Sequence, residues 1–503
     1  MPETNRITVD TKTFTRELEW VARFIERKAT IPILSNVLFQ KRGDLLNLTG
    51  TDLEIGGITS VEVNGDAPDF ELTVPVHLLV KYLKKVDERT VSLLPEITWA
   101  PLREGPHPEE CSDPEECSDG CCCNLKPEIV NVALRLEHGD DGSMNIAGLA
   151  ASQYPELPVR PLATCELTGL ETAIPRTLIS ISNEETRFTL NGALLEVAGK
   201  QARLISTDGH RLSAVDLKSH DRANVKALIP RKALSELLRL GDSAYFCAAG
   251  DHAFFAAGVR VIVARKLTGN FPDYERVLPT DLPYAADVSV APFRKVLDRV
   301  SLFADERSHA VLVSVNGAIT VSAKTYDSGA ADGKVLIDCV RRLDGDNGYQ
   351  PVELAYPYAS GFNAEYVADF LKAAGVPEVR FCFNRCSQAV EWTAPGWRYV
   401  LMPMRDLDRS SNPYAVGDCE PVPAVIAALE AAIEPVASDA IPAVPDVPVA
   451  PEPVPDVTVS VAPATSDLRA RAIELRRQKV SLSAIAKQLN APQSSVWRWT
   501  RSA

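Results

Sequence analysis

Three stretches of the chain share one spacing of apolar and polar positions: residues 74–85, 229–239 and 362–372. Each places apolar side chains at i, i+1, i+4 and i+5, a stripe that buries one face of a helix. Pro75 and Pro230 stand at the helix starts, where a missing N–H costs nothing. The pattern therefore predicts three matching helices. Their apolar positions are Leu78, Leu79, Tyr82, Leu83, Ala233, Leu234, Leu237, Leu238, Tyr366, Val367, Phe370 and Leu371.

The order of predicted elements is repeated as well. Strand-like runs flank each of these helices, and further amphipathic helices are predicted before them, most clearly at 14–25 and 293–300. Corresponding positions lie 117 to 133 residues apart between the second and third copies and about 155 apart between the first and second. Solenoid repeats are much shorter, roughly 20–50 residues. We therefore predict three domain-sized copies, at 1–160, 161–284 and 285–410.

Residues 204–212 are the stretch that most resembles an active site, because a histidine and an arginine follow an Asp-Gly turn. Asp208-Gly209 separates two apolar strand-like runs, and this dipeptide predicts a tight hairpin because Gly accepts a positive φ. His210 and Arg211 then leave the turn near the surface, either as ordinary solvated residues or as part of a site. An enzyme that used Asp208 and His210 as acid and base would need a nucleophile, phosphate-binding or metal-ligand motif, and none stands nearby. We therefore expect no catalysis.

The total charge by itself argues against a nucleic-acid binder. The 503 residues are 46 % hydrophobic and 24 % charged, with a net charge of −14, and phosphate attracts Lys and Arg. The charge is distributed unevenly, however, so the total does not exclude a local basic surface. No apolar run approaches the length of a membrane helix and the N-terminus lacks an apolar signal core. We expect a cytoplasmic protein without a membrane segment.

Five of the 11 cysteines crowd into an acidic stretch at about 103–126 that is punctuated by Pro and Gly. This stretch predicts an inserted surface loop in the first copy. Cys111, Cys117, Cys121 and His107 offer zinc-ligand chemistry, but Cys-x-x-Cys pairs are missing and adjacent cysteines cannot all face one tetrahedral ion. The alternatives are a metal site and a flexible cysteine-rich loop; we favour the loop and predict no metal site and no cofactor.

The amino-acid composition of the chain changes after the third copy. Residues 411–465 form a predicted Pro/Ala-rich acidic linker, which from residue 418 onward contains ten prolines and no Lys or Arg. Residues 466–503 turn basic, with eight Lys or Arg against two acidic residues. Three short predicted helices there have the spacing of a helix-turn-helix, whose last helix would present Arg498 and Arg501 to DNA. A small helical protein-binding tail is the alternative.

Residues 7–405 resemble the bacterial DNA polymerase III beta subunit, the sliding clamp. The resemblance rests on short motifs that occur in family order, and no single one would carry it. They are Ile31-Pro32-Ile33-Leu34, Leu48-Thr49-Gly50-Thr51-Asp52-Leu53-Glu54, Leu190-Asn191-Gly192, Thr207-Asp208-Gly209-His210-Arg211-Leu212, Pro230-Arg231-Lys232, Phe271-Pro272-Asp273-Tyr274, Arg276-Val277-Leu278-Pro279, Gly361-Phe362-Asn363 and Met402-Pro403-Met404-Arg405.

The resemblance implies an α+β fold of three clamp-type domains, each with helices inside and antiparallel sheets outside. Two chains would join head to tail as a homodimeric ring. The implied function is non-catalytic: the ring encircles duplex DNA and tethers the replicative polymerase for processive synthesis. Implied partners are double-stranded DNA, the DNA polymerase III catalytic subunit, the clamp loader complex and other clamp-binding repair or replication proteins. The cysteine-rich loop and the tail are additions to the family pattern.

The resemblance also implies basic side chains that face the DNA and contact phosphates without reading sequence. Phe188 belongs to this set because it stands where the family often has an aromatic residue near DNA. With the two arginines of the tail, the predicted DNA-binding residues are Arg16, Arg23, Arg27, Lys28, Arg187, Phe188, Arg231, Lys232, Arg294, Lys295, Arg299, Arg498 and Arg501.

A peptide-binding pocket between the second and third copies is the other implied site. Only the middle copy carries its edge, because Leu53-Glu54 and Tyr326-Asp327 replace Gly209-His210-Arg211 in the other two. Its implied residues are Leu190, Thr207, Gly209, His210, Arg211, Leu212, Pro272, Arg276, Val277, Asn363, Tyr366, Val400, Met402, Pro403, Met404 and Arg405. The alternative function is a DNA-binding regulatory or scaffold protein that acts through its helix-turn-helix tail.

Overall fold

The computed structural model describes residues 6–99, 129–139, 142–161, 165–184, 186–325, 329–344, 348–354 and 357–404. The predicted cysteine-rich loop, linker and helix-turn-helix tail lie outside the described residues, as do Arg405, Arg498 and Arg501. None of the helices in the described part is long and apolar enough to cross a membrane.

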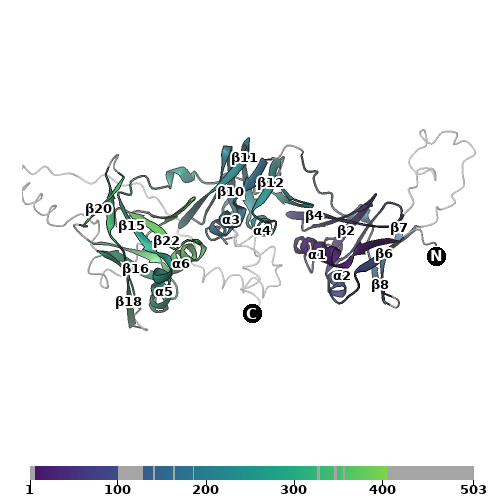
Figure 1. The fold of residues 1–503 in the computed structure, drawn as a ribbon, viewed down its shortest axis with the longest axis horizontal. Coiled ribbons are helices and arrows are strands. Elements are labelled where there is room, and N and C mark those ends of the chain that lie inside the picture. The colour runs from purple at the N-terminus through teal and green to yellow at the C-terminus, as the bar shows by residue number, and fades with distance from the viewer. Residues whose placement is uncertain are drawn as a thin grey trace, which may run out of the picture. The chain divides into compact units, whose positions relative to one another are not determined.

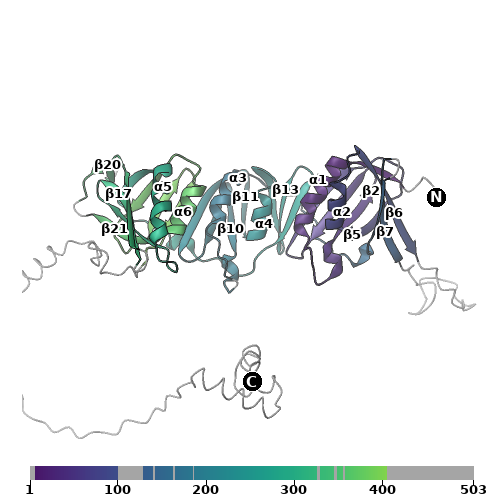
Figure 2. The same ribbon diagram turned by 90° about the horizontal axis from the view of Figure 1, so that it is seen from below.

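The first copy has two helices that pack against two antiparallel sheets (Figures 1 and 2). Asp10 caps the first helix, because its Oδ1 accepts a hydrogen bond of 2.8 Å from the Thr13 N–H. Phe14, Leu18 and Val21 share the buried face of that helix. The elements are β1 (Ile7–Asp10), α1 (Thr11–Val21), η2 (Ala22–Phe24), η3 (Pro32–Ser35), β2 (Asn36–Arg42), β3 (Leu45–Thr51), β4 (Ile55–Glu62), β5 (Phe70–Pro75), α2 (Val76–Leu83), β6 (Thr90–Trp99), β7 (Ile129–His138), β8 (Gly142–Ala147) and η5 (Ala151–Gln153).

The second copy is built around a long hairpin of β10 and β11, in which Thr207 pairs with Leu212 across the turn. This confirms the hairpin predicted at Asp208-Gly209, and Gly209 has the positive φ of 92° that the turn needs. The elements are β9 (Cys165–Thr168), α3 (Leu170–Leu178), η6 (Phe188–Leu190), β10 (Gly192–Thr207), β11 (Arg211–Pro230), α4 (Arg231–Leu237), β12 (Ser243–Ala249), β13 (His252–Ala257), β14 (Arg260–Arg265) and η7 (Tyr274–Arg276).

The third copy repeats the arrangement, with two helices against antiparallel strands (Figure 2). The elements are β15 (Tyr284–Ser289), α5 (Val290–Val300), η8 (Ser301–Phe303), β16 (Ala310–Val315), β17 (Ala318–Thr325), β18 (Gly329–Leu336), β19 (Val340–Leu343), β20 (Tyr349–Val352), β21 (Tyr358–Asn363), α6 (Ala364–Ala373), β22 (Glu378–Phe383), β23 (Val390–Ala394) and β24 (Trp397–Leu401).

Neighbouring copies are joined by strand pairing. β4 of the first copy pairs with β14 of the second, and β11 of the second pairs with β24 of the third. One sheet of 16 strands therefore runs through all three copies in the described part of the chain. Two separate four-stranded sheets complete the first and third copies, in the orders β1-β6-β7-β8 and β18-β17-β16-β21. The strands in these sheets pair antiparallel, which confirms the predicted α+β class.

The three matching helices are confirmed as α2, α4 and α6, but their apolar stripe is wrong at one position. Leu78 is 57 % exposed. The buried face of α2 is made by Val76, Leu79 and Leu83, which follow the i, i+3, i+7 spacing of a single helix face. Because successive residues turn by about 100° around a helix, Leu78 lies off that face.

Candidate peptide pocket and DNA-facing helices

The turn between β10 and β11 is held by two of its own side chains. Thr207 Oγ1 donates to the Arg211 carbonyl at 2.7 Å and accepts from the Gly209 N–H at 3.1 Å. Asp208 Oδ1 accepts from the N–H groups of His210 and Arg211 at 2.9 and 3.0 Å. Because the Asp208 carboxylate is engaged in the turn, it is not placed to act with His210 as an acid–base pair.

The same hydrogen bonds recur in the turn between β3 and β4. Thr51 Oγ1 donates to the Ile55 carbonyl at 2.9 Å and accepts from the Leu53 N–H at 3.0 Å. Asp52 Oδ1 accepts from the N–H groups of Glu54 and Ile55 at 2.9 and 2.8 Å. Leu53 adopts φ 76° where the second copy has a glycine, and this conformation strains a residue with a Cβ. The first and second copies therefore share the turn and its Thr and Asp hydrogen bonds, and they differ in the three residues that follow the Asp.

Arg211 reaches from the turn into the third copy. Its guanidinium bonds Asp208 at 2.9 Å and Asp369 of α6 at 2.8 Å, and it stacks 4.0 Å from the centre of the Tyr366 ring. Burial alone would lower the pKa of Arg211, but Tyr399 and the two carboxylates hold that pKa above its ordinary value. Arg211 is thus a fixed positive charge at the seam between the second and third copies.

A hollow of about 180 Å³ lies beside this turn at the seam. Its floor includes Leu212 and Val400, which are buried and pair with each other across β11 and β24. Its rim includes Val277 and Met402, which are partly exposed, and the Met402 N–H donates to the His210 carbonyl at 3.0 Å. The lining residues are Thr207, Gly209, His210, Arg211, Leu212, Val277, Val400 and Met402, all of which belong to the predicted pocket.

Other residues of the predicted pocket have structural partners nearby. Asn363 caps α6 through Oδ1, which accepts from the N–H groups of Glu365 and Tyr366 at 2.8 and 3.3 Å. Leu190 is buried in η6. The Met404 N–H donates to the carbonyl of Gly361 at 2.9 Å, which places Pro403 and Met404 along β21.

Besides Val277, two residues of the predicted pocket lie on the segment that links the second and third copies. Arg276 is exposed and forms an ion pair of 2.8 Å with Asp273. Pro272 does not line the hollow but lines a larger groove on the second copy.

Sequence reasoning missed Arg176, which fastens the third copy against the second. Its side chain is buried and donates to the carbonyl oxygens of Ala374 at 2.6 Å, Pro395 at 3.0 Å and Ala373 at 3.4 Å. Its guanidinium also lies 5.0 Å from the ring centre of Trp397, and burial lowers its pKa. Nothing in the sequence distinguishes this arginine from one on a solvated helix face, because all its acceptors are backbone carbonyls.

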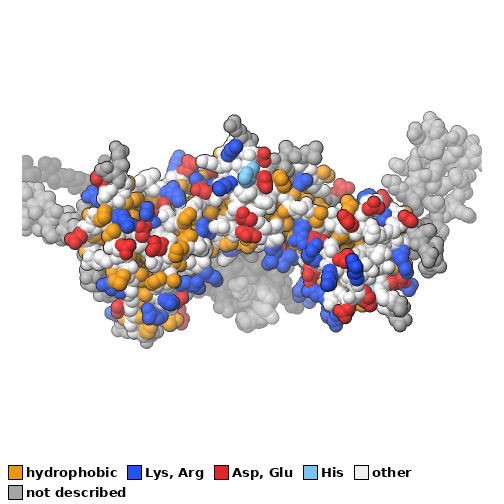
Figure 3. Space-filling view, viewed as in Figure 1, with side chains coloured by type: hydrophobic (Ala, Val, Ile, Leu, Met, Phe, Trp, Pro, Cys, Tyr) orange, Lys and Arg blue, Asp and Glu red, His pale blue; other side chains and the backbone are white. Residues whose placement is uncertain are grey.

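Lys and Arg side chains gather over α1, α2 and the end of α4 (Figure 3). A cleft of about 1310 Å³ lies between the first and second copies there. Among its lining side chains, Glu236 forms an ion pair with Arg23 at 2.5 Å and with Arg239 at 3.4 Å, so the cations outnumber this carboxylate. The charged residues that line the cleft are Arg23, Arg27, Lys84, Arg239, Arg260, Glu19 and Glu236.

Several of the predicted DNA-binding residues are held by partners. Lys232 forms an ion pair with Asp52 of the first copy, and Arg231 donates to the Leu178 carbonyl at 2.7 Å and to the Asn183 side chain. The other partnered cations, with their partners, are Arg16 with Glu17, Arg187 with Glu184 and the Asp208 carbonyl, Arg294 with Asp298, and Arg299 with the Lys295 carbonyl.

The remaining predicted DNA-binding residues of the three copies are exposed. Arg27, Lys28 and Lys295 form no salt bridge within the described residues, so their charges are available to a ligand. Phe188 is 70 % exposed on η6.

Three models of one family match the chain in order. The N-terminal domain of the DNA polymerase III beta subunit matches residues 5–98, the central domain residues 165–273 and the C-terminal domain residues 275–405. A homeodomain-like domain matches residues 463–502. The matches follow the three copies seen in the fold and the basic segment predicted as a helix-turn-helix.

Individual relatives agree with these models. The beta sliding clamp of Caulobacter vibrioides is 27 % identical over 426 residues, which cover 80 % of this chain and 100 % of the relative. That of Pseudomonas aeruginosa is 28 % identical over 419 residues, 79 % of this chain and 99 % of the relative. The crystal structure of the Pseudomonas aeruginosa sliding clamp bound to griselimycin matches with a TM-score of 0.66 at 25 % identity, over 80 % of this chain and 99 % of that one.

Proposed function

The chain belongs to the DNA polymerase III beta subunit family, whose members are non-catalytic sliding clamps, and we propose that two such chains close into a ring around duplex DNA. The ring tethers the replicative polymerase for processive synthesis. The clamp loader opens and closes it on DNA, and partner proteins bind through short peptides in the pocket beside Arg211. No part of this function requires bond making or breaking by the chain.

The observation that carries the ring is two sheet edges that no other strand of the described residues pairs with. β8 ends the separate sheet of the first copy and β18 ends that of the third. β8 has no charged side chain, although charge is the usual protection of an exposed edge. Close to the other edge, Leu302 of η8 is 77 % exposed and Leu336 of β18 is 79 % exposed.

Pairing of β8 from one chain with β18 of the next supports a head-to-tail dimer. Such a contact joins two different surfaces, so it closes into a ring only when the rotation between the chains returns to the start. Two chains of three copies each would then give a ring of six domains. The exposed leucines would be buried at both contacts.

Positive charge on the helices supports contact with duplex DNA. Arg27 and Lys28 in the first copy and Lys295 in the third are exposed on or next to the helices. Phosphate contacts of this kind carry no sequence information and weaken steeply with salt. A ring can therefore slide along DNA while its topology, rather than its affinity, keeps it there.

Retention on circular DNA tests the ring. The full-length chain is loaded onto a nicked circular plasmid by the source organism's clamp loader and passed over a sizing column. We expect it to stay with the circle in high salt and to leave once a restriction enzyme linearises the plasmid. Equal escape from circular and linear DNA would rule out topological tethering.

The homeodomain-like match at residues 463–502 favours a second activity. We propose that the tail is a tethered DNA-binding module that biases where or how the ring loads. Deleting residues 466–503 should lower the affinity of the unloaded chain for linear DNA, and unchanged affinity would exclude this role. The alternative, a sequence-reading regulator with the three copies as scaffold, predicts a discrete footprint on a random DNA library.

A further inference from the structure

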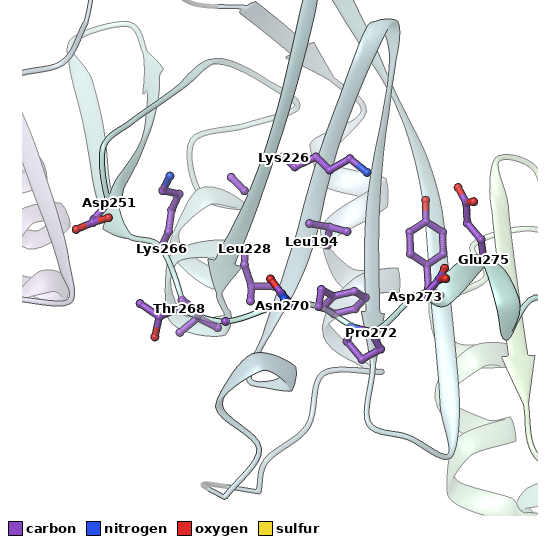
Figure 4. A pocket seen from close by; sticks show the side chains of 15 residues that line it. Leu194, Lys226, Leu228, Asp251, Lys266, Thr268, Asn270, Pro272, Asp273 and Glu275 are labelled. Carbon is purple, nitrogen blue, oxygen red and sulfur yellow. The ribbon is translucent and has the colours of Figure 1, made fainter.

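The second copy carries a groove of about 1340 Å³, partly open to solvent, on the surface of its long hairpin. Leu194 of β10 and Leu228 of β11 are paired across the hairpin and form part of its floor. The segment from Lys266 to Glu275 crosses the hairpin and closes one side, and Asn270 and Pro272 of this segment are among the lining side chains (Figure 4). This groove is far larger than the pocket hollow of about 180 Å³.

The groove and the pocket share one apolar cluster. Leu212 and Val400 line the pocket, whereas Tyr274 lines the groove, and all three belong to the same buried cluster. Leu194 and Phe271 from the groove pack against this cluster. The chain also runs directly from one site to the other, since the groove ends at Glu275 and Val277 stands on the pocket rim. The two sites are therefore neighbours along the chain, and the same buried cluster supports both.

The wall of the groove offers unused backbone donors. Among the described residues, no hydrogen bond is donated by the backbone N–H groups of residues 268 to 271 or of Asp273. This segment is not a strand, but backbone donors without a partner beside an apolar floor can bond an extended peptide, as they do in peptide recognition at a sheet edge. The floor would accept its apolar side chains, and the backbone would supply hydrogen bonds.

The charges on the rim restrict the occupant further. At the end near the pocket, Glu275 is exposed and forms no salt bridge within the described residues. Asp273 is already paired with Arg276, and Lys226 with Glu196 at 2.5 Å. A Lys or Arg side chain in the bound peptide would therefore find its partner at Glu275.

We propose that this groove, here named the flank groove, binds the extended stretch of a partner protein that adjoins the residues in the pocket. The stretch has an apolar side chain for the Leu194–Leu228 floor and a basic side chain for Glu275. The inference rests on the proposed peptide pocket and adds a second contact to it. It accounts for Pro272, which lies in the flank groove and not in the pocket.

Two peptides from the source organism's DNA polymerase III catalytic subunit test the proposal on the full-length chain. The short peptide contains only the pocket-filling residues, and the long peptide adds the native residues on both sides. Fluorescence anisotropy measures both affinities. We expect the long peptide to bind about tenfold more tightly, which corresponds to ~1.4 kcal/mol.

Asn270→Trp should fill the flank groove, with Asn270→Ala as its matched control. The tryptophan variant should bring the long peptide down to the affinity of the short one and leave the short peptide unchanged. If this variant does not fold, Glu275→Lys serves instead and should weaken only the long peptide. Val277→Glu at the pocket rim should weaken both peptides.

Equal affinity of the two peptides for the wild-type chain would overturn the flank groove, as would a long-peptide advantage that survives Asn270→Trp and Glu275→Lys. Loss of the long-peptide advantage in Asn270→Ala would also count against simple filling of the groove. If neither peptide binds the wild-type chain, the pocket itself fails and the flank groove fails with it. These results separate the two claims.

Discussion

Replacing Arg176 by methionine should loosen the seam between the second and third copies. Methionine keeps most of the apolar stem but removes the donors to the carbonyls of Ala374 and Pro395, at 2.6 and 3.0 Å. A hydrogen bond from a charged donor contributes about 1.5–3 kcal/mol. The variant also avoids the cost of burying a guanidinium, which offsets part of the loss. We expect a net loss of about 3 kcal/mol at the seam.

Hydrogen exchange read by mass spectrometry measures this loss locally. The amides of β24 that pair with β11 should exchange roughly a hundredfold faster in Arg176→Met, because each 1.4 kcal/mol is about a factor of ten. The strands β2 and β3 of the first copy serve as an internal control and should not change. Arg294→Met, which removes an exposed arginine from α5, is the matched control variant. Exchange that rises less than about threefold in β24 would refute the reasoning.

Three further predictions concern acid stability, backbone strain and assembly. Burial raises the pKa of Asp287, but Arg380 and Arg341 outweigh burial and hold that pKa below its ordinary value. The ionised carboxylate therefore stabilises the fold above about pH 4, and this stabilisation is lost as the pH falls further. In urea unfolding, Asp287→Asn should therefore be less stable than wild type at pH 7 and converge with it near pH 2. Leu53→Gly should raise the free energy of unfolding by up to about 1 kcal/mol because it relieves the positive φ, whereas Leu53→Ala keeps the strain and should give no gain by the same measurement. The double variant Leu302→Asp, Leu336→Asp should sediment as a monomer where the wild type sediments as a dimer, and a dimer in both would remove these leucines from the ring contact.

The local elements and their repetition follow from residue spacing along the chain. A helix or a half-buried strand shows in the spacing of apolar residues over a few turns, so α2, α4 and α6 and the three copies could be predicted. The hairpin at Asp208-Gly209 could also be predicted, because a positive φ limits which residues stand there. The order of family motifs then indicated which turn forms the edge of a pocket.

Tertiary structure alone decided how the copies meet. Arg211 finds Asp369, and Arg176 finds the Ala374 carbonyl, at sequence separations of 158 and 198. Such contacts leave no local pattern, and a backbone acceptor has no residue signature at all. The same holds for β8 and β18, whose free edges exist only because no other strand of the described chain pairs there. Local periodicity reports which face of an element is apolar, but the partner of that face is set only when distant segments pack.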